Sequence, residues 1–265
     1  MAASSKKSAT SAAKQPPAQE ESLAAAMATA RAQLLESGIG TLNERTLHST
    51  LKCWLQPDAA FHEVPIAGCV ADIFDGERVT EIQTGGLFPL KKKLEVLLAH
   101  YPVTVVVPLP REKWLCWIDP ETGERTAPRR SPKRGKAADV LPELCFVWEF
   151  WNEGATAFPL TVRVLLLDME ESRLLDGWGQ GGKRGSHRVD RVPLAVAGEC
   201  TLESLSDVAA LLSELPAPIT RKDVTKWIGK RGVALSRTLR FLEMAGLIRR
   251  AGKQGNTILF ERSTP

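Results

Sequence analysis

An alternation of apolar and polar residues predicts a β-hairpin in the first third of the chain. Residues 70–74 (Val-Ala-Asp-Ile-Phe) and 79–83 (Val-Thr-Glu-Ile-Gln) alternate with a period of two, and the Asp-Gly-Glu-Arg between them is typical of a hairpin loop. In that register Asp72 lies directly across from Glu81. Opposed residues have Cβ atoms roughly 5 Å apart, and like charges there destabilise a sheet. The pattern predicts either a divalent cation between the carboxylates or an exposed hairpin whose carboxylates meet only water.

Helical and strand patterns flank this hairpin. Residues 41–55 predict a capped helix with a leucine and tryptophan stripe, and this helix places Glu44 and His48 on one face. Glu44 is either an acid held over the hairpin or a first-turn residue favoured by the helix dipole. Residues 87–101 predict a second helix, and the apolar run at 102–108 predicts a central buried strand. The order helix, three strands, helix and strand predicts an α/β fold with a mixed sheet flanked by helices.

The middle of the chain alternates predicted elements with basic loops. We expect strands at 113–118 and 160–167, a helix at 137–151, and a Gly-rich basic loop at 179–191. Six cations and no carboxylate lie between residues 125 and 136, so the segment cannot form ion pairs internally. It is either a phosphate-binding loop or a solvated linker. Its candidate DNA contacts are Arg129, Arg130, Lys133 and Arg134.

The C-terminal segment predicts a helix-turn-helix followed by a hairpin. Thr220 caps a short helix, residues 229–232 form the turn, and a second helix at 234–245 ends at Gly246. Residues 219–262 carry eleven Lys and Arg against three Asp and Glu, a net charge of +8 where the whole chain has +4. A basic terminal domain on an acidic body indicates a polyanionic partner, although such domains also bind proteins. The candidate DNA contacts are Ser236, Arg237 and Arg240 on the second helix and Lys253, Gln254 and Asn256 in the hairpin.

Composition excludes several classes of protein. We find no apolar run that could span a bilayer and no signal-peptide pattern, so we expect an intracellular, cytoplasmic protein without a membrane partner. The five cysteines are scattered without CxxC spacing, which argues against a zinc site or a disulfide framework. Phosphate-loop and dinucleotide motifs are missing, so no nucleotide cofactor is expected. Residues 1–20 have too little apolar surface to fold, while residues 21–37 could form a helix.

At the hairpin the chain resembles the PD-(D/E)XK nuclease superfamily, which has the restriction-endonuclease-like fold. That pattern has an acidic residue on an early helix, an Asp opening a strand hairpin, and Glu-x-Lys on the next strand. The matching positions here are Glu44, Asp72 and Glu81-Ile82-Gln83. The resemblance covers about residues 40–120. It implies a catalytic set of Glu44, Asp72, Glu81 and Gln83, with Mg²⁺ or Mn²⁺ held by Asp72 and Glu81.

Gln83 departs from that pattern, because the superfamily usually has lysine there. A neutral amide can orient a water but cannot take a proton from it. The superfamily's lysine sometimes migrates, so a lysine of the run 91–93 is a candidate replacement, and Lys91 is our choice as an auxiliary residue. His48 is either a substrate or phosphate contact or a surface histidine.

Two further stretches carry a resemblance. The C-terminal phrase Leu-Glu-Met-Ala-Gly-Leu-Ile-Arg-Arg at 242–250 is similar to the winged-helix domains of bacterial regulators. Residues 173–178 (Arg-Leu-Leu-Asp-Gly-Trp) and 183–186 (Lys-Arg-Gly-Ser) look like parts of an uncharacterised bacterial family. That family couples a nuclease-like core to a C-terminal DNA-binding module.

These patterns combine into one expected organisation. Residues 1–37 are disordered or partly helical, 38–120 form the PD-(D/E)XK nuclease-like core, 121–215 form an elaborating α/β segment with basic loops, and 216–262 form the winged-helix domain. The expected function is a metal-dependent DNA endonuclease, or nuclease-like DNA-processing protein, that hydrolyses phosphodiester bonds in double-stranded DNA. The alternatives are a catalytically inactive nuclease fold in a DNA-binding regulator, and an RNA-directed enzyme. The lack of interleaved aromatic residues disfavours single-strand binding. We keep a homodimer among the expectations.

Overall fold

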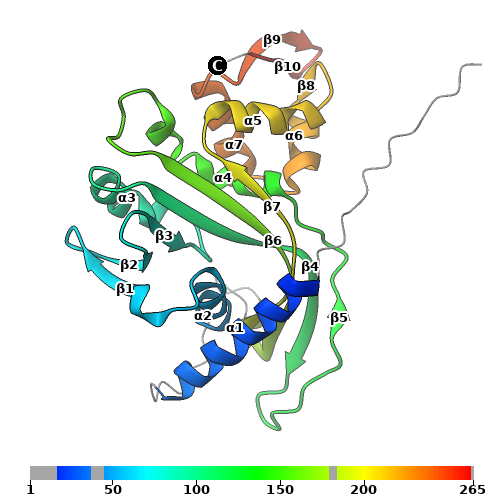
Figure 1. Cartoon of the computed structure of the whole chain (residues 1–265). Coiled ribbons are helices and arrows are strands. Elements are labelled where there is room, and N and C mark those ends of the chain that lie inside the picture. The colour runs from blue at the N-terminus through cyan, green and yellow to red at the C-terminus, as the bar shows by residue number, and fades with distance from the viewer. Residues whose placement is uncertain (1–16, 37–44, 179–183, 264–265) are drawn as a thin grey trace, which may run out of the picture.

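A seven-stranded mixed β-sheet forms the centre of the molecule (Figure 1). The computed structural model describes residues 17–36, 45–178 and 184–263. The strand order is β1-β2-β3-β4-β6-β7, with β5 paired to β4; β3, β4 and β6 run parallel, and the other neighbours are antiparallel. The strands are β1 (His62–Ile66), β2 (Cys69–Phe74), β3 (Val79–Ile82), β4 (Val103–Ile118), β5 (Arg129–Arg130), β6 (Leu160–Trp178) and β7 (Arg184–Leu202).

Helices cover both faces of the sheet, as the sequence predicts. The helices α1 (Pro17–Glu36) and α2 (Arg45–Leu55) bury leucines against one face. The other face is covered by α3 (Lys91–Leu97), α4 (Leu141–Leu144) and three short 3₁₀ helices, η2 (Phe88–Leu90), η3 (Ala137–Val140) and η4 (Trp148–Trp151). The helix expected at 137–151 is therefore a series of single turns. None of the described helices has both the length and the apolar character needed to cross a membrane.

The central sheet includes long strands that lie beyond the predicted core at residues 38–120. The strands expected at 102–108 and 113–118 are one strand, β4, and β6 pairs with it in parallel along nearly its whole length. The boundary expected at residue 120 therefore does not coincide with an edge of the sheet, because main-chain hydrogen bonds join both sides of it. The basic loop expected at 179–191 is partly strand, since residues 184–191 belong to β7 and pair with β6.

The basic segment 125–136 lies against β4 and finds carboxylates on neighbouring strands. Arg125 Nη2 lies 2.8 Å from Glu170 Oε1. Arg134 Nη2 lies 3.1 Å from Glu112 Oε1, which Arg130 also contacts. The segment forms no ion pairs internally, as expected, but for these three arginines the sheet supplies carboxylates from outside the segment, which neither the phosphate-binding loop nor the solvated linker includes. All four candidate DNA contacts of this segment, Arg129, Arg130, Lys133 and Arg134, are exposed.

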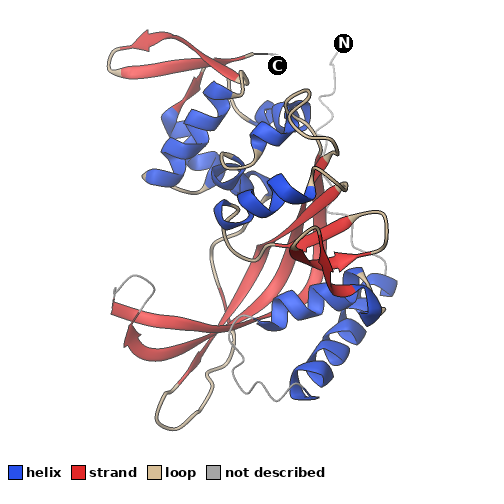
Figure 2. Cartoon of the chain, turned by 90° about the vertical axis from the view of Figure 1, so that its left-hand side faces the viewer, coloured by secondary structure: helices blue, strands red, loops and turns tan. Residues whose placement is uncertain are grey.

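The C-terminal unit has the predicted order of helix, turn, helix and hairpin. Thr220 Oγ1 accepts a hydrogen bond from Asp223 N–H at the start of the first helix. Gly229 ends that helix in the left-handed region, with φ of 62°. The elements are α5 (Leu205–Leu211), η5 (Leu212–Glu214), β8 (Ile219–Thr220), α6 (Arg221–Ile228), α7 (Val233–Met244), β9 (Ile248–Gln254) and β10 (Thr257–Arg262). Figure 2 shows this unit beyond one end of the long strands.

The C-terminal unit shares a hydrophobic core with the sheet. Helix α7 packs on α4, and the rings of Trp148 and Phe241 lie 6.1 Å apart. Lys230 Nζ donates to the carbonyl oxygen of Asp139 at 3.0 Å. Buried side chains form one continuous cluster from α3 and β4 through α4 to α6 and α7. The unit is therefore fixed on the body by packing and is not merely tethered to it.

Candidate active site

The opposed carboxylates lie where strands β2 and β3 separate. The Ile73–Thr80 pair confirms the predicted register, in which the next step places Asp72 across from Glu81. At that step the carboxylates replace main-chain acceptors. Ile82 N–H donates to Asp72 Oδ2 at 2.7 Å, and Asp72 N–H donates to Glu81 Oε1 at 3.3 Å. Each acid is thus bound to the backbone of the opposite strand.

Two side chains from the flanking helices approach these acids. Lys93 of α3 places Nζ 2.5 Å from Glu81 Oε2, and His48 of α2 places Nε2 3.1 Å from Asp72 Oδ2. The side chain of Glu81 is only 4% exposed, whereas that of Asp72 is 23% exposed. Because α2 and α3 cover opposite faces of the sheet, the opening between the strands joins groups from both helix layers. We call Asp72, Glu81, Lys93 and His48 the carboxylate site.

The two acids respond to this environment in opposite ways. Burial and the charge of Asp72 raise the pKa of Glu81, and they outweigh the hydrogen bond and charge of Lys93. Burial alone would raise the pKa of Asp72, but the hydrogen bond and charge of His48, the Ile82 N–H and the Lys93 charge together lower it. Neighbouring carboxyl groups with divergent pKa values are typical of sites where the two have different roles.

Ionised Glu81 should cost the protein stability in metal-free buffer. Its pKa is raised on folding, so the folded state binds the proton more tightly than the unfolded chain does. Stability therefore falls as pH rises from roughly 4 through the raised pKa. Glu81→Gln cannot ionise and should lack this loss. In urea unfolding between about pH 5 and pH 8, the wild type should lose stability relative to the variant. If the free energy of unfolding of the wild type rose relative to that of the variant with rising pH, the raised pKa of Glu81 would be contradicted.

The donor set fits a small hard cation. No group of three or more His, Cys, Asp and Glu side chains within the described ranges could enclose a metal ion. Mg²⁺ does not need enclosure, because it commonly binds one or two carboxylates and completes its shell with water and substrate phosphates. Among the described residues, the hydrogen bonds to the Asp72 carboxylate all reach Oδ2, and none of them uses Oδ1. Asp72 and Glu81 are therefore the residues that would hold Mg²⁺ or Mn²⁺.

The carboxylate site lies inside a region that matches a protein family. Residues 45–203, more than half of the chain, match the family described as Domain of unknown function (DUF8091). The chain belongs to this family. The DUF8091 domain begins at α2 and ends just after β7, so it contains the whole central sheet and all four residues of the carboxylate site. Helix α1 and the C-terminal unit lie outside it.

Similarity to one relative extends beyond the DUF8091 domain. A protein of Treponema pallidum (strain Nichols), described as "Uncharacterized protein", is 28% identical over 230 residues. The match covers 86% of this chain and 88% of the relative. No solved structure matches the chain.

Three of the residues predicted for the active site are not among the four residues of the carboxylate site. The Gln83 amide donates to the carbonyl oxygen of Gly86 at 2.7 Å, so it closes the turn after β3. Lys91 pairs with Glu149 at 3.0 Å. Glu44 lies outside the described residues. Lys93, and not Lys91, is the lysine of the 91–93 run that contacts Glu81. Residues two apart point to different sides of a helix, so the two lysines have different partners.

The turn after β3 is fastened by two residues that the sequence does not single out. Leu87 N–H donates to Glu143 Oε2 at 3.0 Å, and Arg191 Nη2 donates to the carbonyl oxygen of Thr84 at 3.2 Å. Glu143 comes from α4 and Arg191 from β7, both distant in the chain. The DUF8091 domain thus holds the segment between Glu81 and α3 from two sides.

The candidate DNA contacts of the C-terminal unit lie on its outer surface. Ser236, Arg237 and Arg240 are exposed on α7, opposite its buried leucines, and Lys253, Gln254 and Asn256 are exposed on the β9–β10 hairpin. Arg237 also borders the body, because its guanidinium carbon lies 5.0 Å from the centre of the Phe146 ring. One edge of α7 therefore meets the DUF8091 domain, and the rest of its polar face is open.

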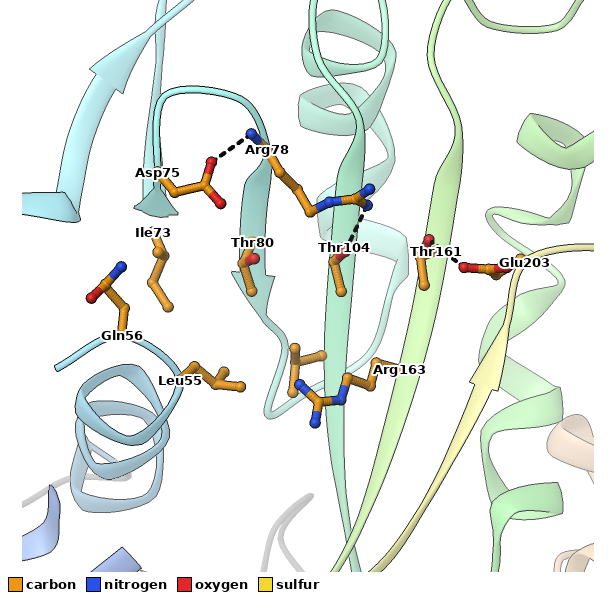
Figure 3. Close-up of a pocket in the computed structure, with 11 residues that line it drawn as sticks. Leu55, Gln56, Ile73, Asp75, Arg78, Thr80, Thr104, Thr161, Arg163 and Glu203 are labelled. Carbon is orange, nitrogen blue, oxygen red and sulfur yellow. Dashed lines mark hydrogen bonds between the residues drawn. The ribbon is translucent and has the colours of Figure 1, made fainter. Parts of the chain in front are cut away.

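A polar pocket lies on the opposite face of β3 (Figure 3). Its volume is about 340 Å³, and Thr80, Thr104 and Thr161 form a row along its wall because the strand register pairs them. Thr104 Oγ1 accepts a hydrogen bond from Arg78 at 3.2 Å, and Thr161 donates to Glu203 at 3.5 Å. Two arginines in the lining are matched by two carboxylates. The pocket therefore lacks the excess positive charge that a phosphate site needs.

Proposed function

We propose that the protein is a metal-dependent nuclease that hydrolyses phosphodiester bonds in DNA. The observation that carries this proposal is the meeting of Asp72, Glu81 and Lys93 at the opening between β2 and β3. Opposed carboxylates with a lysine are the residue set of the PD-(D/E)XK superfamily, and Lys93 would take the role of the lysine missing at position 83. The order α2, β1, β2, β3, α3, β4 supports the same assignment.

Each residue of the carboxylate site has a role in this proposal. Asp72 and Glu81 would hold Mg²⁺ or Mn²⁺, which supplies a water of lowered pKa and offsets charge on the scissile phosphate. The Lys93 ammonium would donate to a phosphate oxygen as negative charge builds on it. His48 would hold Asp72 through Oδ2. Gln83 would keep the turn closed, so that Lys93 supplies the fixed cation.

The C-terminal unit would act as a winged-helix module that delivers duplex DNA. Residues 219–262 have a net charge of +8, and the candidate contacts on α7 and the hairpin are exposed. Lysine and arginine contacts to phosphates supply affinity that falls steeply with salt. Side chains of the second helix would read base edges in the major groove.

One observation favours a second candidate, a catalytically inactive nuclease fold in a DNA-binding regulator. Lys93 and His48 already satisfy both acids within the chain, and the Gln83 amide is bound to its own turn. Such a closed network of charges can serve the fold without any metal. The two candidates differ in what a divalent cation does to the protein.

Thermal unfolding and DNA cleavage measured with and without metal separate the candidates. Millimolar Mg²⁺ or Mn²⁺ should raise the melting temperature of the wild type, because an ion that binds only the folded state stabilises it by mass action. Asp72→Asn should lose most of that gain, whereas Glu95→Gln, a change of an exposed acid on α3, should keep it. Linear, circular and single-stranded DNA should be cut only with metal. No thermal shift and no cleavage would favour the regulator.

A further inference from the structure

Two aromatic rings and two arginines form a surface between the DUF8091 domain and α7. Phe88 is 65% exposed, and its ring meets that of Phe146 edge to face at 5.2 Å. The Arg237 guanidinium lies over Phe146 at 5.0 Å, and the exposed Arg240 is one helical turn further along α7. We call Phe88, Phe146, Arg237 and Arg240 the Phe88 surface. It joins the DUF8091 domain to the C-terminal unit.

The position of Phe88 is fixed although its ring is exposed. Leu87 beside it is buried, and its N–H is held by Glu143. Single exposed apolar residues are common on proteins and need no explanation. Phe88 differs because a second ring supports it from one side and two arginines lie nearby. It also begins η2, on the segment that connects Glu81 on β3 with Lys93 on α3.

An unpaired nucleotide matches the chemistry of this surface. An exposed phenylalanine ring stacks on the face of a base, and guanidinium groups bind the attached phosphate. Bases inside a duplex have both faces covered by their neighbours, so the ring can stack only on a base that has left the helix or lies at its end. The scarcity of aromatic residues in any one segment does not exclude this binding, because the fold brings together residues 88 and 146.

We propose that the Phe88 surface binds an unpaired nucleotide, so that the preferred substrate has a junction between duplex and single strand. The proposal rests on the nuclease function proposed above and names its substrate class. The duplex would lie on α7 and the β9–β10 hairpin. The single strand would cross Phe88 and reach Asp72 and Glu81.

Binding of the full-length protein to matched DNAs tests the proposal. Fluorescence anisotropy in EDTA would compare a blunt duplex with the same duplex carrying a single-stranded overhang. Phe88→Ala should weaken binding of the overhang DNA about ten-fold and leave blunt-duplex binding unchanged, as expected from the loss of one base–aromatic stack. Phe88→Trp should keep the preference. Val96→Ala, a change of an exposed apolar residue on the neighbouring helix α3, should keep it too.

A fluorescent base analogue at the junction gives a direct measurement of stacking. Its emission should be quenched on binding to the wild type and not on binding to Phe88→Ala. A Phe88→Ala variant that binds both DNAs like the wild type, or weakens both equally, would overturn the proposal. Because the assay needs no metal, a Phe88-dependent overhang preference would stand even if cleavage failed. Cleavage of every DNA at rates indifferent to Phe88→Ala would support the nuclease and refute the substrate class.

Discussion

Glu81→Gln should abolish metal-dependent cleavage while leaving the fold and duplex binding intact. The side chain is buried against Asp72, and an amide in its place removes one of the two charges that would hold the metal ion. We expect a loss of about 1,000-fold or more, since metal stabilisation of charge in the transition state amounts to several kcal/mol. Single-turnover cleavage at saturating DNA measures the chemical step, and anisotropy measures binding.

Binding by Glu81→Gln should equal or slightly exceed that of the wild type. A carboxylate near a phosphate is repulsive until a cation arrives, so its neutralisation cannot weaken capture. Glu95→Gln on the exposed side of α3 is the matched control and should cleave normally. If wild type and Glu81→Gln were indistinguishable in every cleavage assay, the enzyme proposal would give way to the regulator.

Lys93→Met should reduce cleavage by about 100-fold or more, and Gln83→Lys should restore much of that loss in the double variant. Removing one group that stabilises developing charge typically costs this much. Position 83 directly follows β3, and its N–H still donates to the carbonyl oxygen of Val106, so the strand alternation carries its side chain to the Glu81 face. In the wild-type background Gln83→Lys should keep or modestly raise activity, because Lys93 already supplies the cation.

Lys92→Met is the matched control for Lys93→Met, because Lys92 is exposed on the same helix and should be dispensable. Metal titration followed by thermal unfolding should show that Lys93→Met still binds the ion. That result would separate a defect in charge stabilisation from a loss of the metal. Full activity in Lys93→Met would instead assign Lys93 to a structural ion pair with Glu81.

The hairpin register follows from local sequence, whereas the partners of its acids do not. Alternation and loop length decide which residues of β2 and β3 face each other, so Asp72 opposite Glu81 is predictable. The choice between Lys91 and Lys93 depends on how α3 is rotated against the sheet, which is decided by distant core contacts of Leu94 and Leu97. The short pattern does not contain that information.

The extent of the sheet also cannot be predicted from the local sequence. Residues 160–167 show a strand pattern, but nothing in it names β4 as the partner of β6. The segment 125–136 contains no acid, yet Glu170 and Glu112 reach its arginines at 125, 130 and 134 across strands. The C-terminal helices and hairpin are predictable because their caps and turns are local. Their packing on α4 is not, because Phe146 and Trp148 lie about ninety residues earlier.

The shared core between the sheet and the C-terminal unit fixes the distance between α7 and the carboxylate site. Trp148 and Phe241, together with the buried cluster around them, leave no hinge at which α7 could swing away from the body without exposing apolar surface. DNA gripped by α7 would meet Asp72 and Glu81 at one fixed separation along its strand. The cut would then fall at a constant distance from the bound site, whatever the sequence at the cut.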